Sequence, residues 1–366
     1  MTEIATILRQ EVEREGVISL ARFMDLALYC PNLGYYEQEG SRIGRSGDFF
    51  TSVSTGSLFG ELLAFQFALW RETGTFQEWH LVEAGAHDGQ LALDVLRWLR
   101  EARPKLFARL EYWLVEPSSR RQGWQRAKLD KFAGRIRWVE TLPALPKDSV
   151  GGVIFCNELL DAFPVHRVAW DKSARKWFEW GVGVSEGQFV WQRLELAGRD
   201  WNGELRRAGI EMSDGLGAVL PDGFTIDLCP AAGEWWRTAA EALRQGRLLT
   251  FDYGLTADQI LAPERSQGTL RAYYRHHGSR EVLLKPGDRD LTAHVNFTQL
   301  QRAGQAAGLK TDGLYTQEQF LTRVGQVLWE KGATIGAPSP KQVRQFQSLT
   351  HPEHLGRAFR VLVQSR

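Results

Sequence analysis

The chain has 366 residues, of which 43% are hydrophobic and 24% charged, a composition typical of a folded globular protein. Its 45 basic and 44 acidic side chains leave a formal charge of +1, which excludes a strong overall attraction to nucleic acid or to an anionic membrane surface. The three cysteines, Cys30, Cys156 and Cys229, form no CxxC pair, so we expect neither a disulfide framework nor a zinc site.

The N-terminal part is predicted to be helical. Residues 1–30 read as helix, with Ser19 as an N-cap for a helix that ends before Pro31. They resemble neither a signal peptide nor a transit peptide, and no apolar run in the chain reaches the roughly 20 residues of a membrane span. We therefore expect a cytoplasmic protein that does not enter a membrane.

A glycine-rich loop that carries aromatic residues follows, over residues 31–52. So many glycines beside aromatic side chains favour a shaped binding segment over a simple spacer. A second helix is expected at about 57–72, because Leu58, Leu62, Phe65 and Leu69 recur along one face. We treat residues 1–75 as an N-terminal helical segment with this loop.

From residue 80 the chain alternates between strand and helix. Apolar runs predict strands at 80–84, 111–116, 136–140, 149–157 and 246–254, and the amphipathic stretches 90–102, 118–132 and 231–244 predict helices. Such alternation is typical of a parallel sheet with helices on both faces. Two late strands, 308–315 and 358–365, separated by a helical stretch, are expected to form an antiparallel pair at the sheet edge.

Residues 165–228 interrupt this alternation. They contain four short runs of strand character, at 165–171, 175–184, 187–196 and 223–228, with turn residues between them. We interpret them as a β-rich insertion that forms a region for substrate or partner binding. The core domain is then formed by residues 76–164 and 229–366.

The first core strand leads into a glycine turn, LVEAGAHDGQL, that contains Glu83, Gly85 and Gly89. Such a turn lets the backbone approach a ligand at the start of the next helix. The spacing is not the GxGxxG of dinucleotide enzymes, and Asp88 at the helix start would oppose a phosphate. The turn therefore favours S-adenosylmethionine (SAM), a sulfonium with an amino-acid tail, over a nicotinamide dinucleotide.

The second core strand ends in LVEPSS, with Glu116 at its tip. A carboxylate in that place can accept hydrogen bonds from both hydroxyls of a ribose. The alternative is a solvent-exposed glutamate with no ligand.

Several long motifs, in order along nearly the whole chain, resemble the MidA family of class I methyltransferases. They are GYY (34–36), IGRSGDFFTS (43–52), LFGELLA (58–64), LVEAGAHDG (81–89), LVEPS (114–118), CNELLDAFPVHR (156–167), LLTFDYG (248–254), GTLRAYYRHH (268–277) and PGDRDLTAHVNF (286–297). The family includes a mitochondrial complex I assembly factor that methylates an arginine. The resemblance implies an α/β, Rossmann-like fold whose seven-stranded sheet is mainly parallel with an antiparallel edge.

The resemblance also implies which residues bind SAM. They are Gly47, Asp48, Phe49 and Thr51 in the loop, Glu83, Gly85, Ala86 and Gly89 in the turn, Glu116 and Pro117 after the second strand, and Asn157 after the fourth. For Asp48 the alternative is a cap of the local turn. The sequence departs from the family at His87, which replaces the third glycine of the turn and could crowd the cofactor.

Transfer of a methyl group from a sulfonium is an in-line displacement with a good leaving group, so we expect no metal. An arginine acceptor is always charged, and carboxylates can hold it and take its proton. Glu158 and Asp161, with Asn157 to orient a ligand, are the expected catalytic group; the alternative is that they are acids at a helix N-terminus. His294 is either a proton relay or a structural histidine. Asp252 could meet substrate or pair with an arginine.

The sequence thus predicts a SAM-dependent methyltransferase acting on a protein, with arginine as the favoured acceptor. Two alternatives remain at this point: a catalytically weak assembly protein that keeps the cofactor fold, and, less favoured, an NAD-dependent oxidoreductase. We expect a protein partner, no nucleic acid and no membrane, and the sequence leaves a homodimer open.

Overall fold

The central element is a twisted, mostly parallel sheet whose strands follow the predicted runs closely. The computed structural model describes residues 2–38, 51–74, 78–194, 199–274, 277–330 and 338–366. Along the sheet the order is β15-β16-β10-β5-β2-β3-β4, and only β16 runs antiparallel to its neighbours, β10 and β15. The bounds are β2 His80–Ala84, β3 Glu111–Val115, β4 Ile136–Val139, β5 Val150–Asn157, β10 Leu243–Leu255, β15 Lys310–Thr316 and β16 Phe359–Ser365. The predicted seven-stranded sheet with an antiparallel edge is confirmed.

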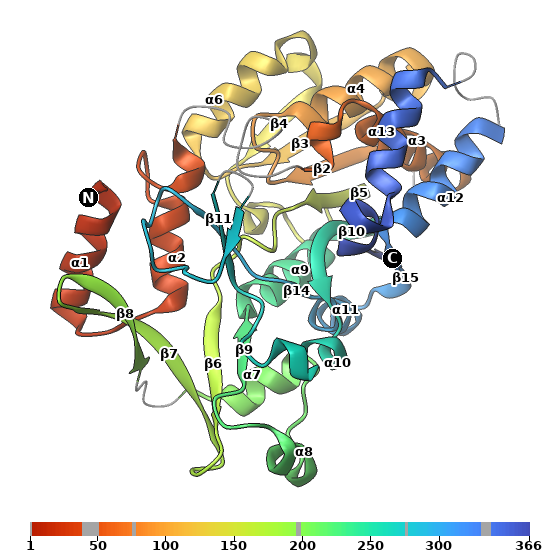
Figure 1. The fold of residues 1–366 in the computed structure, drawn as a ribbon. Helices are drawn as coiled ribbons and strands as arrows, with labels where there is room; N and C mark the ends of the chain where they lie inside the picture. Colours follow the sequence, from red (N-terminus) through yellow and green to blue (C-terminus); the bar gives the residue numbers. More distant parts are fainter. Residues whose placement is uncertain (1, 39–50, 75–77, 195–198, 275–276, 331–337) are drawn as a thin grey trace.

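Helices cover both faces of this sheet (Figure 1). Alternate strand residues point to opposite faces, so Leu81 and Tyr112 join one core while Val82 and Trp113 join the other. The first core is closed by α3 (Leu58–Thr73), α4 (Gln90–Ala102), α12 (Gln317–Glu330) and α13 (Pro340–Thr350). The second is closed by α9 (Pro230–Ala242) and α11 (Phe297–Ala306). The helix after β3 is shorter than predicted: α6 spans Ser119–Lys128, and a 3-10 segment, Asp130–Arg135, follows it.

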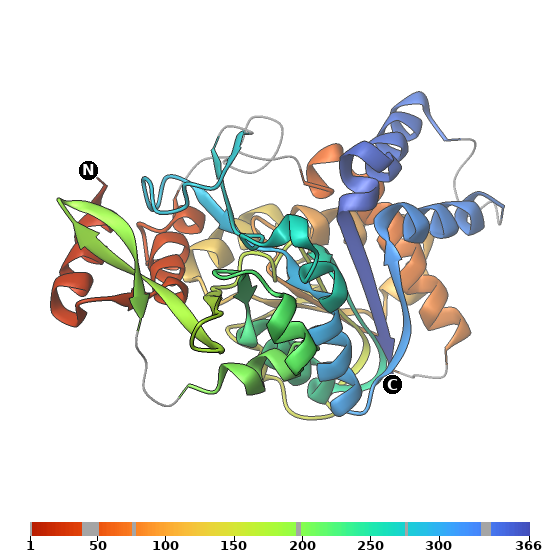
Figure 2. The same cartoon turned by 60° about the horizontal axis from the view of Figure 1, so that its bottom comes forward.

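The N-terminal segment forms two helices, α1 (Glu3–Glu15) and α2 (Leu20–Tyr29). The predicted cap is confirmed, because the Ser19 hydroxyl accepts a hydrogen bond from the Arg22 amide at 3.1 Å. Between the helices, β1 (Ile18–Ser19) pairs antiparallel with the strand that contains Gly181 and Val182. The segment is therefore joined to the insertion by backbone pairing, and both views place α1 and α2 beside β7 and β8 (Figures 1 and 2).

In the described part of 165–228, an antiparallel sheet is formed by β6 (His166–Asp171), β7 (Lys176–Ser185), β8 (Gln188–Leu194) and β9 (Thr225–Leu228). The sequence did not predict two short helices in this region, α7 (Trp201–Arg207) and α8 (Asp214–Val219). Three buried tryptophans, Trp170, Trp177 and Trp201, explain them, because they share a core to which the α7–α8 region contributes Leu205 and Ala208.

Smaller elements complete the fold. A three-stranded sheet, β12-β11-β13, lies beside the carboxyl ends of the core strands (Figure 1). The remaining bounds are η1 Tyr35–Glu37, η2 Val53–Thr55, α5 Pro104–Phe107, η4 Leu142–Ala144, α10 Ala257–Ile260, η5 Pro263–Arg265, β11 Arg271–Tyr274, β12 His277–Ser279, β13 Asp290–Thr292, β14 Val295–Asn296 and the π-turn Pro352–Gly356. Within the described ranges, no helix has the length and apolar character needed to cross a membrane.

Candidate active site

Two cavities meet at the carboxyl ends of the parallel strands, where α/β proteins bind their ligands. The larger is about 480 Å³, and the smaller is about 140 Å³. Tyr36 and Glu158 line both, so one glutamate stands between the two spaces. The larger is lined by Asp25, Tyr29, Gly85, His87, Glu116, Pro117, Arg121, Glu140, Leu142, Phe163 and Trp235, among others. The smaller is lined by Thr51, Asp161, Tyr253, Thr269, Arg271, Tyr273, Asp290, Thr292, Ala293 and His294.

The glycine turn after β2 forms one wall of the larger cavity. Gly85 has φ 74°, in the left-handed region, and a Cβ added there would lie 2.7 Å from Leu159 Cδ1. The left-handed backbone favours glycine at this position. Gly89, with φ 87°, is the N-cap residue just before α4, while Ala86 is buried in the same turn. Of the three turn residues predicted to bind the cofactor, Gly85, Ala86 and Gly89, only Gly85 belongs to the described lining of the larger cavity.

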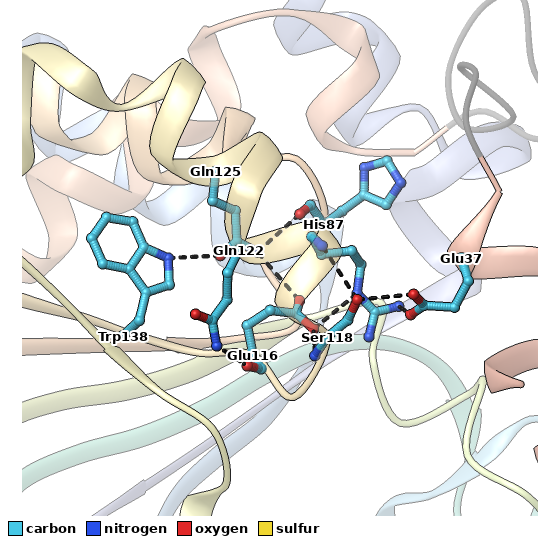
Figure 3. Close-up of polar contacts among 8 residues, drawn as sticks. Glu37, His87, Glu116, Ser118, Gln122, Gln125 and Trp138 are labelled. Atoms are coloured by element: carbon cyan, nitrogen blue, oxygen red, sulfur yellow. Dashed lines mark hydrogen bonds and ion pairs between the residues drawn. The ribbon is translucent and has the colours of Figure 1, made fainter. Parts of the chain in front are cut away.

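His87 has a backbone conformation that favours glycine. Its φ is 46°, a conformation that non-glycine residues rarely adopt. The Gln125 side-chain amide donates to the His87 carbonyl at 2.9 Å and holds the turn. The imidazole lies 6.2 Å from the Trp124 ring and points away from Glu116 (Figure 3). The imidazole lines the larger cavity but does not fill it, because the cavity volume of about 480 Å³ remains with the ring in this position.

We expect His87→Gly to be neutral or stabilising, by up to ~1 kcal/mol. Glycine removes the cost of a left-handed residue, about 1–2 kcal/mol, and loses part of that gain to chain entropy. Urea denaturation of both proteins measures the difference. A loss of more than ~1 kcal/mol would show that the imidazole contacts outweigh the backbone strain.

The negative charge of Asp88, which the sequence places against a phosphate ligand, is balanced by a neighbouring lysine. Its carboxylate accepts from the Gln90 amide at 3.0 Å and pairs with the Lys128 ammonium. Burial opposes ionisation, but hydrogen bonds from His87 and Lys128 outweigh it and hold the pKa of Asp88 well below its usual value. Since Lys128 balances this charge, Asp88 is a weaker argument against a phosphate ligand than the sequence alone suggested.

Glu83 lies inside the protein, with 3% of its surface exposed. The Tyr112 hydroxyl donates to its carboxyl at 2.5 Å, and burial raises the pKa of Glu83 to about 7. Among the described residues that line the larger cavity, Glu83 is absent. The structure therefore places it beneath the glycine turn rather than against a ligand.

Glu116 directly follows β3 and lies in a network of polar side chains (Figure 3). Its Oε1 accepts from the Ser118 amide and from Arg121 Nε, both at 2.9 Å, and its Oε2 accepts from Gln125 Nε2 at 3.2 Å. Only 1% of Glu116 is exposed, which excludes the solvent-exposed alternative. Pro117 follows it in the cavity wall.

The smaller cavity brings together acids from two parts of the chain, Glu158 and Asp161 after β5 and Asp290 in β13. Glu158, with φ 51°, accepts from the Ser52 amide at 3.1 Å and from the Asn157 side chain at 3.0 Å. Burial raises the pKa of Glu158 to about 8, and the neighbouring Asp161 adds to the effect. Burial likewise raises the pKa of Asp161 to about 7. The predicted pair thus does share one site.

A third acid, Asp290, was not singled out from the sequence. It is fully buried, and the Tyr36 hydroxyl donates to its Oδ1 at 2.8 Å. The two residues are 254 positions apart, so only the fold brings them together. Tyr36 lies in the GYY motif and Asp290 in the PGDRDLTAHVNF motif, and these motifs were the signal in the sequence that could have pointed to the pair.

Other predicted residues have different surroundings from those expected. Thr51 lines the smaller cavity, not the larger one, and its hydroxyl accepts from the Ser54 amide at 3.0 Å. The idea that Asp252 meets substrate or pairs with an arginine is wrong: its two oxygens accept from the Leu160 and Tyr253 amides, each at 2.9 Å. Gly47, Asp48 and Phe49 lie outside the described residues.

His294 stands exposed at the mouth of the smaller cavity. Desolvation by the surrounding chain, helped by the charges of Arg265 and Arg271, lowers the pKa of His294 to about 4. The relay role of His294 remains a prediction.

The raised carboxyl pKa values predict a pH-dependent stability. Glu158, with a pKa of about 8, and Asp161, at about 7, titrate near pH 4 when unfolded. The folded state therefore holds protons that the unfolded state lacks, and the stability they contribute, complete below about pH 4, is lost as the pH rises through 7 to 8. We expect the Tm of the ligand-free protein to fall between about pH 6.5 and 8.5, and the Glu158→Gln/Asp161→Asn variant to fall less. A Tm that rises over this interval would contradict the assignment.

The geometry of the larger cavity fits a SAM nucleoside. Gly85 lines this cavity without a side chain, so a ligand can approach its backbone, and the Glu116 carboxylate lies just after β3, where it can accept from ribose hydroxyls. Asn157, predicted to bind the cofactor, is absent from the described lining of both cavities; its Nδ2 donates to Glu158, and its Oδ1 is buried with no hydrogen-bond partner among the described residues.

Comparisons with known proteins agree with a SAM cofactor. Residues 62–315 match the family Methyltransf_28, described as "Putative S-adenosyl-L-methionine-dependent methyltransferase". A Burkholderia thailandensis protein crystallised with S-adenosyl-homocysteine is similar in structure, with a TM-score of 0.82, 30% identity, and coverage of 99% of this chain and 92% of that one.

Two curated relatives are also similar over nearly the full length. The mouse (Mus musculus) and human (Homo sapiens) proteins named "Protein arginine methyltransferase NDUFAF7, mitochondrial" are each 27% identical over 98% of this chain. The alignments cover 83% of the mouse protein and 82% of the human one. Because the family match covers more than half of the chain, this protein belongs to the Methyltransf_28 (MidA) family of SAM-dependent methyltransferases, with S-adenosyl-L-methionine as its cofactor.

Proposed function

We propose that this enzyme transfers the methyl group of SAM to an arginine side chain of a partner protein. The observation that carries the proposal is the second cavity, where Glu158, Asp161 and Asp290 gather next to the cofactor cavity. A guanidinium group keeps its charge at any ordinary pH, and carboxylates match its planar fork with paired hydrogen bonds. Burial disfavours the ionised form of Glu158 and Asp161, and a cation bound in this cavity would stabilise it.

The side chains divide the chemistry between them. When bound, SAM supplies a methyl group whose bond to sulfur breaks as the bond to the acceptor nitrogen forms. Glu158, shared by both cavities, is the group best placed to hold the guanidinium in line and to take the proton that it releases. The arriving positive charge lowers the pKa of Glu158 and Asp161, so both carboxyls ionise when they are needed.

Aromatic side chains shape the same cavity. Tyr36, Tyr253 and Tyr273 line it and can stack on a planar guanidinium. Arg271 adds one positive charge to the lining, and burial lowers its pKa. Once the acceptor's charge has ionised Glu158 and Asp161, their two carboxylates outnumber this cation, which keeps the balance favourable for a cationic acceptor.

The names of the curated relatives, protein arginine methyltransferases, support the same choice of acceptor. Those names also say mitochondrial, whereas a cytoplasmic location remains our prediction for this chain. A protein substrate and a homodimer remain predictions as well.

Labelling with radioactive SAM in a cell lysate, followed by mass-spectrometric mapping, tests the proposal. The expected product is a protein that carries methyl groups on an arginine side-chain nitrogen. Label on lysine, on a carboxylate or on a small molecule would contradict the arginine acceptor. Binding of S-adenosylhomocysteine without any labelling would instead favour the alternative of a catalytically weak assembly protein.

A further inference from the structure

Glu37 reaches the cofactor site from the N-terminal segment. It is the last residue of η1 and 7% exposed, and it lies 81 positions from Ser118, which it contacts. The Ser118 hydroxyl donates to Glu37 Oε2 at 2.9 Å, and Arg121 Nη1 lies 3.4 Å from Glu37 Oε1 (Figure 3 labels Glu37 and Ser118). Glu37 is thus a buried acid from the N-terminal segment that contacts two residues following β3, Ser118 and Arg121.

The same contacts divide the oxygens of Glu116 unequally. Oε1 takes two donors at 2.9 Å, the Ser118 amide and Arg121 Nε, while among the described residues Oε2 takes one, Gln125 Nε2 at 3.2 Å. An ionised carboxylate offers about two acceptor positions on each oxygen. Oε2 therefore keeps capacity for one further donor, and Glu116 lines the larger cavity.

The orientation of Arg121 determines whether Glu116 Oε2 remains open to a further donor. Its guanidinium is planar and rigid. Nε donates to Glu116 Oε1, whereas Nη1 pairs with Glu37 Oε1. An arginine next to a lone carboxylate prefers a two-pronged contact with both oxygens. Without Glu37, the fork can turn onto Glu116 and cover Oε2.

We propose that Glu37 is a positioning residue for the cofactor: it holds Arg121 to one side, so that Oε2 of Glu116 stays open to a ribose hydroxyl of SAM. Glu37 itself does not belong to the described lining of the cavity, so it acts through Arg121. The inference rests on the cofactor and on the expected ribose contact of Glu116, and it does not depend on the acceptor.

Calorimetric titration with S-adenosylhomocysteine tests it. Glu37→Gln is expected to weaken binding by roughly 10-fold, the worth of one hydrogen bond to a charged group. Glu13→Gln, an exposed acid of α1, is the matched control and should bind like wild type. Adenosine should lose affinity by a similar factor in Glu37→Gln, whereas 2′,3′-dideoxyadenosine, which lacks both hydroxyls, should lose almost none.

A double variant separates positioning from simple packing. If Glu37 acts through Arg121, Glu37→Gln/Arg121→Met should bind S-adenosylhomocysteine as Arg121→Met does. Additive losses, equal losses for adenosine and its dideoxy analogue, or unchanged binding in Glu37→Gln would each overturn the proposal. Failure of the wild type to bind S-adenosylhomocysteine would overturn the cofactor site itself, and with it this inference.

Discussion

Glu158→Gln is expected to lower kcat for methyl transfer by roughly 10²–10⁴, the usual contribution of a positioned acid–base group. Glutamine keeps the shape and can still accept from the Ser52 amide and the Asn157 side chain, which hold Glu158 now. It cannot take a proton, and it brings no charge to a guanidinium. The affinity for S-adenosylhomocysteine should change by less than about threefold, because the rest of the cofactor cavity is untouched.

Initial rates of label transfer and calorimetry on the same preparations measure both quantities. Glu264→Gln, an exposed acid in η5, is the control and should keep wild-type rates. In the wild type, kcat/KM should rise with pH up to about 8, because burial raises the pKa of Glu158 to about 8 and only the ionised form accepts a proton. Equal labelling by wild type and Glu158→Gln would remove Glu158 from the mechanism.

Asp252→Ala is expected to reduce the free energy of unfolding by about 2–5 kcal/mol. Asp252 is fully buried on β10, and its carboxyl accepts from the amides of Leu160 and Tyr253 at 2.9 Å. Alanine leaves two buried N–H groups without partners, at a cost of ~1–3 kcal/mol each. Because Leu160 lies between Glu158 and Asp161, the loop that carries both acids should loosen as well.

Urea denaturation gives the stability, and Asp214→Ala supplies the control. Asp214 lies in α8 with its side chain fully exposed, so its loss should change stability by no more than ~0.5 kcal/mol. A loss below ~1 kcal/mol for Asp252→Ala would show that water replaces the carboxyl and that the loop does not depend on it.

The sheet was predictable because its signals are local. Each parallel strand is an apolar run with a glycine or a charged residue at its end, and both faces are buried, so the run itself marks the strand. The Ser19 cap depends on a contact only three residues away. The helices α7 and α8 were missed because their stability depends on packing under the buried tryptophans of the insertion, which the local pattern does not contain.

The site was predictable only where its residues follow a strand. Gly85, Glu116, Glu158 and Asp161 all lie just after core strands, and they line the two cavities as expected. Glu37, Gln125 and Asp290 were missed because their partners are set by tertiary contacts that no spacing encodes. Asp252 was misread for a related reason: a carboxyl at a strand end looks the same in sequence whether it faces a ligand or two backbone amides.

A crystal structure with S-adenosylhomocysteine tests the central claim, that the cofactor and the acceptor occupy two cavities separated by Glu158. The nucleoside is expected between Gly85 and Glu116, with the sulfur directed toward Glu158 and the smaller cavity. A larger cavity closed by the imidazole of His87, or a ligand whose sulfur points away from Glu158, would contradict the account.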